Sequence, residues 1–125
     1  MARILVAEDE RDIRELIRFT LTFAGHEIFT AANGEEAVEQ AQALLPDLIL
    51  MDVRMPRLTG YEACRQIKAT DSLKDTPVVF LSAKGQDTEV ATGLEAGADD
   101  YILKPFAPAE LTEHINGILQ RMGMA

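Results

Sequence analysis

Five short runs of apolar and β-forming residues recur along this chain, and after each run apolar residues return at helical spacing. The runs are residues 3–7, 27–32, 48–51, 78–81 and 101–103. Most of them are continuously apolar, which is typical of strands that are buried on both faces of a sheet. Strands of this kind that alternate with helices belong in a parallel sheet covered by helices on both faces. The pattern therefore predicts a doubly wound α/β fold of five βα units.

The segments between the runs carry signals that begin and end helices. Asn33 and Glu36 have the spacing of a helix N-cap and its third residue, and Thr59 and Glu62 repeat it. Gly93 and Gly97 are expected to weaken the fourth helix. In the last two helices the expected inward positions are Val90, Leu94 and Ala98, and then Leu111, Ile115, Ile118, Leu119 and Met122.

The composition fits one acidic domain. The chain has 125 residues, the length of a single domain that needs no disulfide or metal to hold its core. Its net charge of −9 argues against direct binding to nucleic acid or to an anionic membrane surface. Cys64 is the single cysteine, no apolar run is as long as a membrane span, and no secretory signal opens the chain. A reducing cytoplasm is therefore the expected location.

Polar side chains stand where four of the runs end. Glu8 and Asp9 follow the first run, Asp52 the third, Ser82 the fourth and Lys104 the fifth. Right-handed crossovers bring the carboxyl ends of parallel strands to one edge of the sheet, where such folds bind ligands. Carboxylates gathered there would repel one another and raise each other's pKa values unless cations lay between them. Lys104 supplies one positive charge, and we expect Mg²⁺ bound by carboxylate oxygens to supply the rest.

This set of groups suits the transfer of a phosphoryl group. Asp52 is the candidate nucleophile, because carboxylates can form aspartyl phosphates. Lys104 and Mg²⁺ would hold the oxygens on which charge gathers, and the Ser82 hydroxyl would donate to the phosphoryl oxygens. An ordinary structural alternative exists for Glu8 and Asp9, since both stand where they could cap the first helix.

The motifs around these residues resemble the receiver domain of bacterial two-component response regulators over nearly the whole chain. The matching segments are VAEDE at 6–10, LMDVRMP at 50–56, Gly60, LSA at 81–83, GADDY at 97–101 and KPF at 104–106. Each segment is weak evidence by itself, but all of them in this order, at predicted strand and helix ends, are specific. The resemblance implies a flavodoxin-like strand order of 2-1-3-4-5 and a receiver domain that occupies residues 1–125.

The resemblance also implies a role for each acidic residue. Asp52 would accept the phosphoryl group from the phosphohistidine of a histidine kinase. Asp9 would bind Mg²⁺ directly and Glu8 would bind it through water. The backbone carbonyl of Arg54 would be a further ligand of the metal, and Lys104 would bind the phosphoryl group.

Two further residues match the switch of this family. Ser82 stands at the position of the switch hydroxyl, and Tyr101 at that of an aromatic residue that turns inward when the hydroxyl moves toward the phosphoryl group. The peptide between Lys104 and Pro105 is typically cis in the family. Ser82 replaces the commoner threonine and lacks its methyl group, so its coupling to Tyr101 is expected to be looser.

The implied activity is that of a phosphoacceptor switch and not of an enzyme. Its expected phosphoryl donor is a histidine kinase or a phosphotransfer protein. The surface formed by the fourth helix, the fifth strand and the fifth helix is expected to bind a downstream protein, or a second copy of the chain after phosphorylation. No direct contact with nucleic acid or with a membrane is expected.

Two other functions stay open at this point. A phosphatase similar to the haloacid dehalogenase class would also use an aspartate nucleophile, but in a DxD motif on the first strand, and here Arg54 is the second residue after Asp52. A scaffold that works without phosphorylation would typically lack the acceptor or the lysine, and both are present. The five units use nearly the whole chain without an effector domain, so we expect either a stand-alone receiver, which we favour, or the N-terminal part of a longer protein.

Overall fold

In the computed structural model, residues 2–83 and 87–123 are described, except for the side chains of residues 83 and 87–90. Across these residues five strands alternate with five helices. The strands are β1 (Arg3–Ala7), β2 (Glu27–Ala31), β3 (Leu48–Asp52), β4 (Val78–Ala83) and β5 (Asp100–Lys104). The helices are α1 (Arg11–Phe23), α2 (Gly34–Leu44), α3 (Gly60–Lys68), α4 (Asp87–Glu95) and α5 (Pro108–Arg121).

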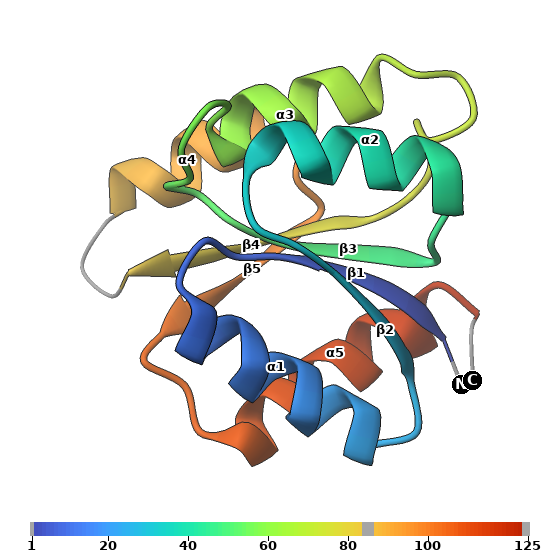
Figure 1. Ribbon diagram of the computed structural model, residues 1–125, viewed down its shortest axis with the longest axis vertical. Coiled ribbons are helices and arrows are strands. Elements are labelled where there is room, and N and C mark those ends of the chain that lie inside the picture. Colours follow the sequence, from blue (N-terminus) through green and yellow to red (C-terminus); the bar gives the residue numbers. More distant parts are fainter. Residues whose placement is uncertain (1, 84–86, 124–125) are drawn as a thin grey trace.

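The strands form one parallel sheet in the order β2-β1-β3-β4-β5, which confirms the predicted fold and strand order. Helices α1 and α5 cover one face of the sheet, and α2, α3 and α4 cover the other (Figure 1). An apolar core lies on each face, and the residues of β1, β3 and β4 contribute to both. The central strands are therefore buried on two sides, as their continuously apolar sequences require.

The predicted helix caps are present. The side chain of Asn33 accepts a hydrogen bond of 2.9 Å from the backbone N–H of Glu36, at the start of α2. Thr59 and Glu62 form a reciprocal capping box at the start of α3. These contacts satisfy N–H groups that have no partner inside the helix, so they fix where each helix begins. No described helix combines the length and the apolar character that a membrane crossing requires.

The predicted inward faces of α4 and α5 were wrong in part. Leu94 is 49% exposed and Met122 is 39% exposed, although both were expected to face the core. Ala98 lies beyond the end of α4 but packs against the core as expected, and the side chain of Val90 lies outside the described residues. Met122 is the C-cap of α5, just beyond the last helical residue.

Gly93 explains the orientation of α4. A Cβ atom on Gly93 would lie 2.7 Å from Cδ2 of Phe80 on β4, so the backbone of α4 packs directly on this ring. Real Cβ atoms do not approach a carbon so closely, and a side chain at this position would push the helix away from the sheet. The glycine that weakens the helix by propensity is thus the residue that allows its packing.

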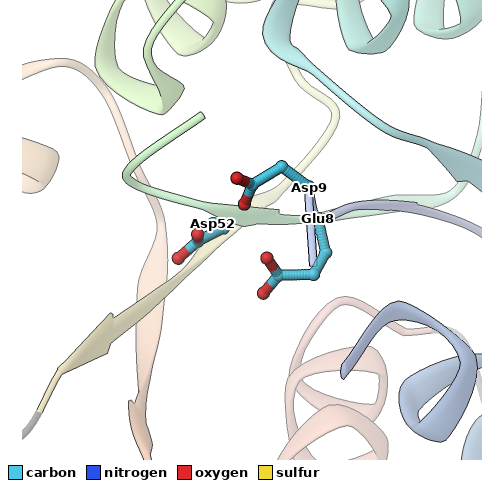
Figure 2. Close-up of side chains that lie close together, drawn as sticks. All are labelled: Glu8, Asp9 and Asp52. Carbon is cyan, nitrogen blue, oxygen red and sulfur yellow. The ribbon is translucent and has the colours of Figure 1, made fainter. Parts of the chain in front are cut away.

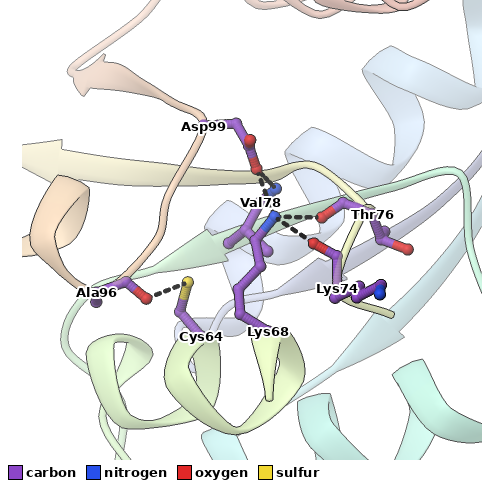
Figure 3. A network of polar contacts seen from close by, with 7 residues as sticks. All are labelled: Cys64, Lys68, Lys74, Thr76, Val78, Ala96 and Asp99. Carbon is purple, nitrogen blue, oxygen red and sulfur yellow. Dashed lines mark hydrogen bonds and ion pairs between the residues drawn. The ribbon is translucent and has the colours of Figure 1, made fainter. Parts of the chain in front are cut away.

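A polar network joins α3 to the segment between α4 and β5 (Figure 3). The Lys68 ammonium donates to the carboxylate of Asp99 at 2.8 Å, and the same carboxylate oxygen accepts the backbone N–H of Val78 at 2.9 Å. The thiol of Cys64 donates to the carbonyl of Ala96 at 3.5 Å. Burial raises the pKa of this thiol to about 11, so Cys64 serves as a small buried side chain and not as a reactive thiol.

Candidate functional site

The carboxyl ends of β1 and β3 bring three acidic side chains together. Glu8 and Asp9 directly follow β1, and Asp52 is the last residue of the neighbouring strand β3. Figure 2 shows Glu8 and Asp9 leaving the end of β1 on different sides, each with its carboxylate turned toward Asp52. One oxygen from each residue lies within 4.8 Å of the others. The convergence predicted from the strand ends is confirmed.

The acids differ in their exposure to water. Glu8 is fully buried, Asp52 is 7% exposed and Asp9 is exposed. Burial and the charge of Asp52 raise the pKa of Glu8 to about 7, against the opposing effects of the Glu10 backbone N–H and of Lys104. Burial also raises the pKa of Asp52, although Lys104 opposes the shift. Loss of hydration on burial, together with repulsion between the acids, therefore outweighs the positive charge of Lys104.

Among the described residues, Lys104 brings its ammonium group into this cluster. It ends β5, and its ammonium group lies 2.9 Å from Oδ1 of Asp52 and 3.3 Å from Oε1 of Glu8. Burial lowers the pKa of Lys104, but the two carboxylates outweigh burial and raise it, so the side chain stays charged. The peptide between Lys104 and Pro105 is cis, as the resemblance implied.

Arg14 contacts the backbone of Glu8 and Asp9, and its role was not predicted from the sequence. Its guanidinium donates to the backbone carbonyl of Glu8 at 2.9 Å and lies 3.5 Å from that of Asp9. Arg14 therefore fixes the chain where it leaves β1. Its position near the start of α1 was visible in the sequence, but helical periodicity does not distinguish an arginine that turns back to the strand from one in solvent.

Ser82 lies beside the cluster, and its hydroxyl is without a partner. In the β3–β4 register Asp52 pairs with Leu81, so Ser82 stands one residue closer to the edge where the acids gather. Its side chain is buried, and its Oγ has no hydrogen-bond partner among the described residues. An unpartnered buried hydroxyl costs free energy, and this hydroxyl is available to donate to a group at the end of β4.

Tyr101 is the predicted site residue that the structure keeps apart from the acids. It lies on β5 with a side chain that is 36% exposed, and it lines a surface groove with Phe106 and His114. Arg54, in the loop between β3 and α3, lines a different groove of about 580 Å³ together with Asp9 and Tyr61. The acidic cluster thus opens onto the groove beside Arg54, while Tyr101 lies on the outer surface.

The donor set fits a hard divalent cation. All three acids offer carboxylate oxygens, which Mg²⁺ prefers, and an exposed acid at the mouth leaves space for retained water. The negative charge of Asp52 is one cause of the raised pKa of Glu8, and a bound divalent cation would offset that repulsion.

Comparisons with known proteins agree with this site. The family model described as "Response regulator receiver domain" matches residues 4–116. The "Probable transcriptional regulator ycf27" of Pyropia yezoensis is 43% identical over 119 residues, which are 95% of this chain and 48% of that protein. The chain spans about half the length of the curated relatives it matches.

Solved structures are similar over nearly the whole chain. The chemotaxis response regulator CheY4 of Vibrio cholerae has a TM-score of 0.90 at 34% identity, covering 95% of this chain and 99% of that one. The receiver domain of the sensor histidine kinase PA1611 from Pseudomonas aeruginosa PAO1 has a TM-score of 0.85 at 36% identity, with 96% and 95% covered. That structure has a magnesium ion coordinated in its active site cleft.

Proposed function

Because the chain belongs to the response regulator receiver domain family, we propose that Asp52 accepts a phosphoryl group from the phosphohistidine of a histidine kinase or phosphotransfer protein. A receiver domain is a phosphorylation switch and not a conventional enzyme, so the phosphatase alternative does not hold. The observation that carries the proposal is the placement of Asp52 at a strand end, among two further acids and 2.9 Å from the Lys104 ammonium.

In the proposed reaction the Asp52 carboxylate is the nucleophile. Lys104 holds Oδ1 of Asp52, which orients the carboxylate and leaves the second oxygen to attack phosphorus. The new oxygen–phosphorus bond forms as the bond from phosphorus to the imidazole nitrogen breaks, and the imidazole leaves with its electron pair. The Lys104 ammonium then lies where it can balance the charge added to Asp52.

Mg²⁺ is the proposed cofactor. Asp9 and Asp52 would bind it through their carboxylates, Arg54 through its backbone carbonyl, and Glu8 through water. A bound Mg²⁺ would neutralise negative charge on the carboxylates and on the transferring phosphoryl group. The proposal is supported by the grouping of the acidic oxygens, by the raised pKa of Glu8, and by the magnesium ion in the related receiver domain.

Ser82 and Tyr101 are the proposed switch. The Ser82 hydroxyl, buried and without a partner among the described residues, would donate to an oxygen of the phosphoryl group on Asp52. Its movement would open space into which Tyr101 turns from its present exposed position. The surface of α4, β5 and α5 would then bind a downstream protein or a second copy of the chain. This is a shift between two packed states that phosphorylation biases.

We extend the proposal to the domain organisation and the cellular location of the protein. Residues 1–125 would form a receiver domain that contains no effector domain. The Pyropia relative is named a probable transcriptional regulator and has about twice this length, so any contact with DNA would be made outside the receiver domain. A kinase partner and a buried Cys64 that forms no disulfide fit a cytoplasmic location.

The test uses acetyl phosphate as the donor, with and without Mg²⁺, and intact-protein mass as the readout. We expect one added phosphoryl group on the wild type only when Mg²⁺ is present, and none on Asp52→Asn. Asp71→Asn, a change at an exposed aspartate far from the cluster in sequence, should be modified like the wild type. An unmodified wild type, or an Asp52→Asn variant that gains the group, would contradict the proposal.

A further inference from the structure

The first residue of α2 lies directly against the loop of residues 53–59, which joins β3 to α3. A Cβ atom on Gly34 would lie 2.0 Å from the carbonyl oxygen of Leu58, and 2.7 Å from both its carbonyl carbon and its Cβ. Two of these three atoms belong to the backbone, so they cannot rotate away as the end of a flexible side chain can. A residue larger than glycine fits at position 34 only if the loop moves.

Backbone conformation does not account for a glycine at this position. Gly34 does not adopt a positive φ, unlike Gly25 and Gly97. Alanine is the better helix former, so on propensity a glycine in the first turn of α2 is unfavourable. The close contact with Leu58 is therefore the physical reason for glycine here.

The loop that Gly34 contacts is the one that shapes the acidic site. It begins immediately after Asp52 and contains Arg54, which lines the groove beside Asp9. At its far end Gly60 is packed against the same strand end, because a Cβ there would lie 2.3 Å from the carbonyl oxygen of Asp52. The Gly60 N–H also donates to the carbonyl of Val53 at 2.9 Å.

A second contact ties α2 to this loop. Arg57 has a φ of 70°, in the left-handed region, and its guanidinium lies 3.6 Å from the carboxylate of Glu35, the residue after Gly34. The loop is thus held from two sides, by Gly60 against Asp52 and by the start of α2 against Leu58. Because the loop is short and held at both places, a displacement at Leu58 would also move its other residues.

We propose that Gly34 is a positioning residue for phosphoryl transfer, which acts through Leu58 on the loop that follows Asp52 and carries Arg54. The inference rests on the proposed function of Asp52, but it concerns an element, α2, that contributes no group to the acidic cluster. The absence of a side chain at position 34 sets the path of the loop, and through it the distance between the phosphoryl-accepting oxygen and the metal ligands.

The test compares Gly34→Ala with Gly117→Ala. Gly117 also lies in a helix, and a Cβ there would meet no atom within 4 Å, so it controls for the change in helix propensity. Mg²⁺ affinity is measured by calorimetric titration with MgCl₂, and phosphorylation by acetyl phosphate is followed by mass. We expect Gly34→Ala to slow phosphorylation about 10- to 100-fold, as displacements near 1 Å do, and to weaken Mg²⁺ binding. Gly117→Ala should match the wild type in both.

A second variant keeps the proposal falsifiable if Gly34→Ala folds poorly. In Gly34→Ala/Leu58→Gly the Cβ at position 58 is gone, and the wider backbone freedom of glycine lets the carbonyl at position 58 turn away from the new methyl group, so the rate and the Mg²⁺ affinity should recover in part. A folded Gly34→Ala with the wild-type rate and affinity would overturn the proposal, and so would a double variant as impaired as the single one. A wild type that acetyl phosphate does not modify would instead refute the function proposed for Asp52, and the Mg²⁺ titrations would still report on Gly34.

Discussion

The ammonium group of Lys104 reaches across β4 to within 2.9 Å of Oδ1 of Asp52, although the two residues end strands that are not neighbours in the sheet. The same ammonium lies 3.3 Å from Glu8 at the end of β1. One side chain thus contacts acids from two other strands, and its charge is shared among them. Replacing Lys104 should change the phosphorylation rate and the Mg²⁺ affinity in different directions, and measuring both distinguishes its role in phosphoryl transfer from its role in charge balance.

Lys104→Met should slow phosphorylation of Asp52 by acetyl phosphate about 100- to 1000-fold, because a fixed cation beside the transferring group is lost. Its effect on Mg²⁺ should have the opposite sign, since a cation that competes for the carboxylates is removed. Rates from intact mass and affinities from calorimetry check this, with exposed Lys74→Met as the control. Equal rates in Lys104→Met and the wild type would show that the ion pair has no part in the transfer.

Mg²⁺ should stabilise the fold. A cation that binds only the folded acidic cluster adds about 3 kcal/mol when its free concentration is about 100 times its dissociation constant. Asp9→Asn should lose this effect. In EDTA the same variant should be more stable than the wild type by about 1 kcal/mol, because the charge of one acid whose oxygen lies within 4.8 Å of two others is gone. Urea unfolding with and without Mg²⁺ measures both, and an Asp9→Asn variant that is less stable in EDTA would contradict the expected repulsion.

The ionised carboxylate of Asp100 should stabilise the fold, and this stabilisation should disappear at low pH. Burial raises the pKa of Asp100, but the backbone N–H of Tyr101 and the side chains of Arg121 and His114 outweigh burial and lower it below 3.8. Between the lowered pKa and about pH 3.8, the unfolded chain therefore binds more protons than the folded chain. The stabilisation by Asp100 is present above about pH 3.8 and is lost as the pH falls through the lowered pKa. Asp100→Asn should cost about 1 kcal/mol or less near neutral pH.

This loss should shrink toward zero in the acid range, because the wild-type carboxyl group is then protonated too. Urea midpoints across the pH range measure the difference, and Asp75→Asn, at an exposed aspartate, is the control. A cost that stays constant as the pH falls would mean that Asp100 stabilises the fold without its charge.

Gly93→Ala should lower the free energy of unfolding by about 1–3 kcal/mol, although alanine favours a helix, because the new Cβ would overlap the ring of Phe80. Gly117→Ala, in open space on α5, should be neutral or stabilising. Thermal or urea unfolding of both variants measures the contrast. Equal stability gains in the two would show that α4 does not need the close approach to β4.

The order of the strands and helices and the convergence of the acidic side chains could both be predicted from the sequence. Continuous apolar runs and helical spacing defined each element, and parallel strands then brought Asp9, Asp52 and Lys104 to one edge. The capping residues Asn33 and Thr59 were also predicted, since their signals are local in the chain.

Features that depend on long-range packing could not be predicted. Periodicity places Leu94 and Gly93 on neighbouring faces, but only the position of the Phe80 ring decides which of them turns to the sheet. The return of Arg14 to the backbone of Glu8 depends on how α1 leaves β1. The pairing of His114 with Asp100, 3.4 Å apart, depends on how α5 crosses β5.

The contacts of α3 with the segment after α4 restrict how α4 can respond to a change at Ser82. Cys64 holds the carbonyl of Ala96, and Lys68 holds the carboxylate of Asp99, so the carboxyl end of α4 is fastened to its neighbour. Any displacement of α4 that keeps these bonds is a swing about a pivot at that end, with the largest travel at its amino end. If phosphorylation displaces α4 as proposed, these bonds would turn the displacement into a tilt of the helix.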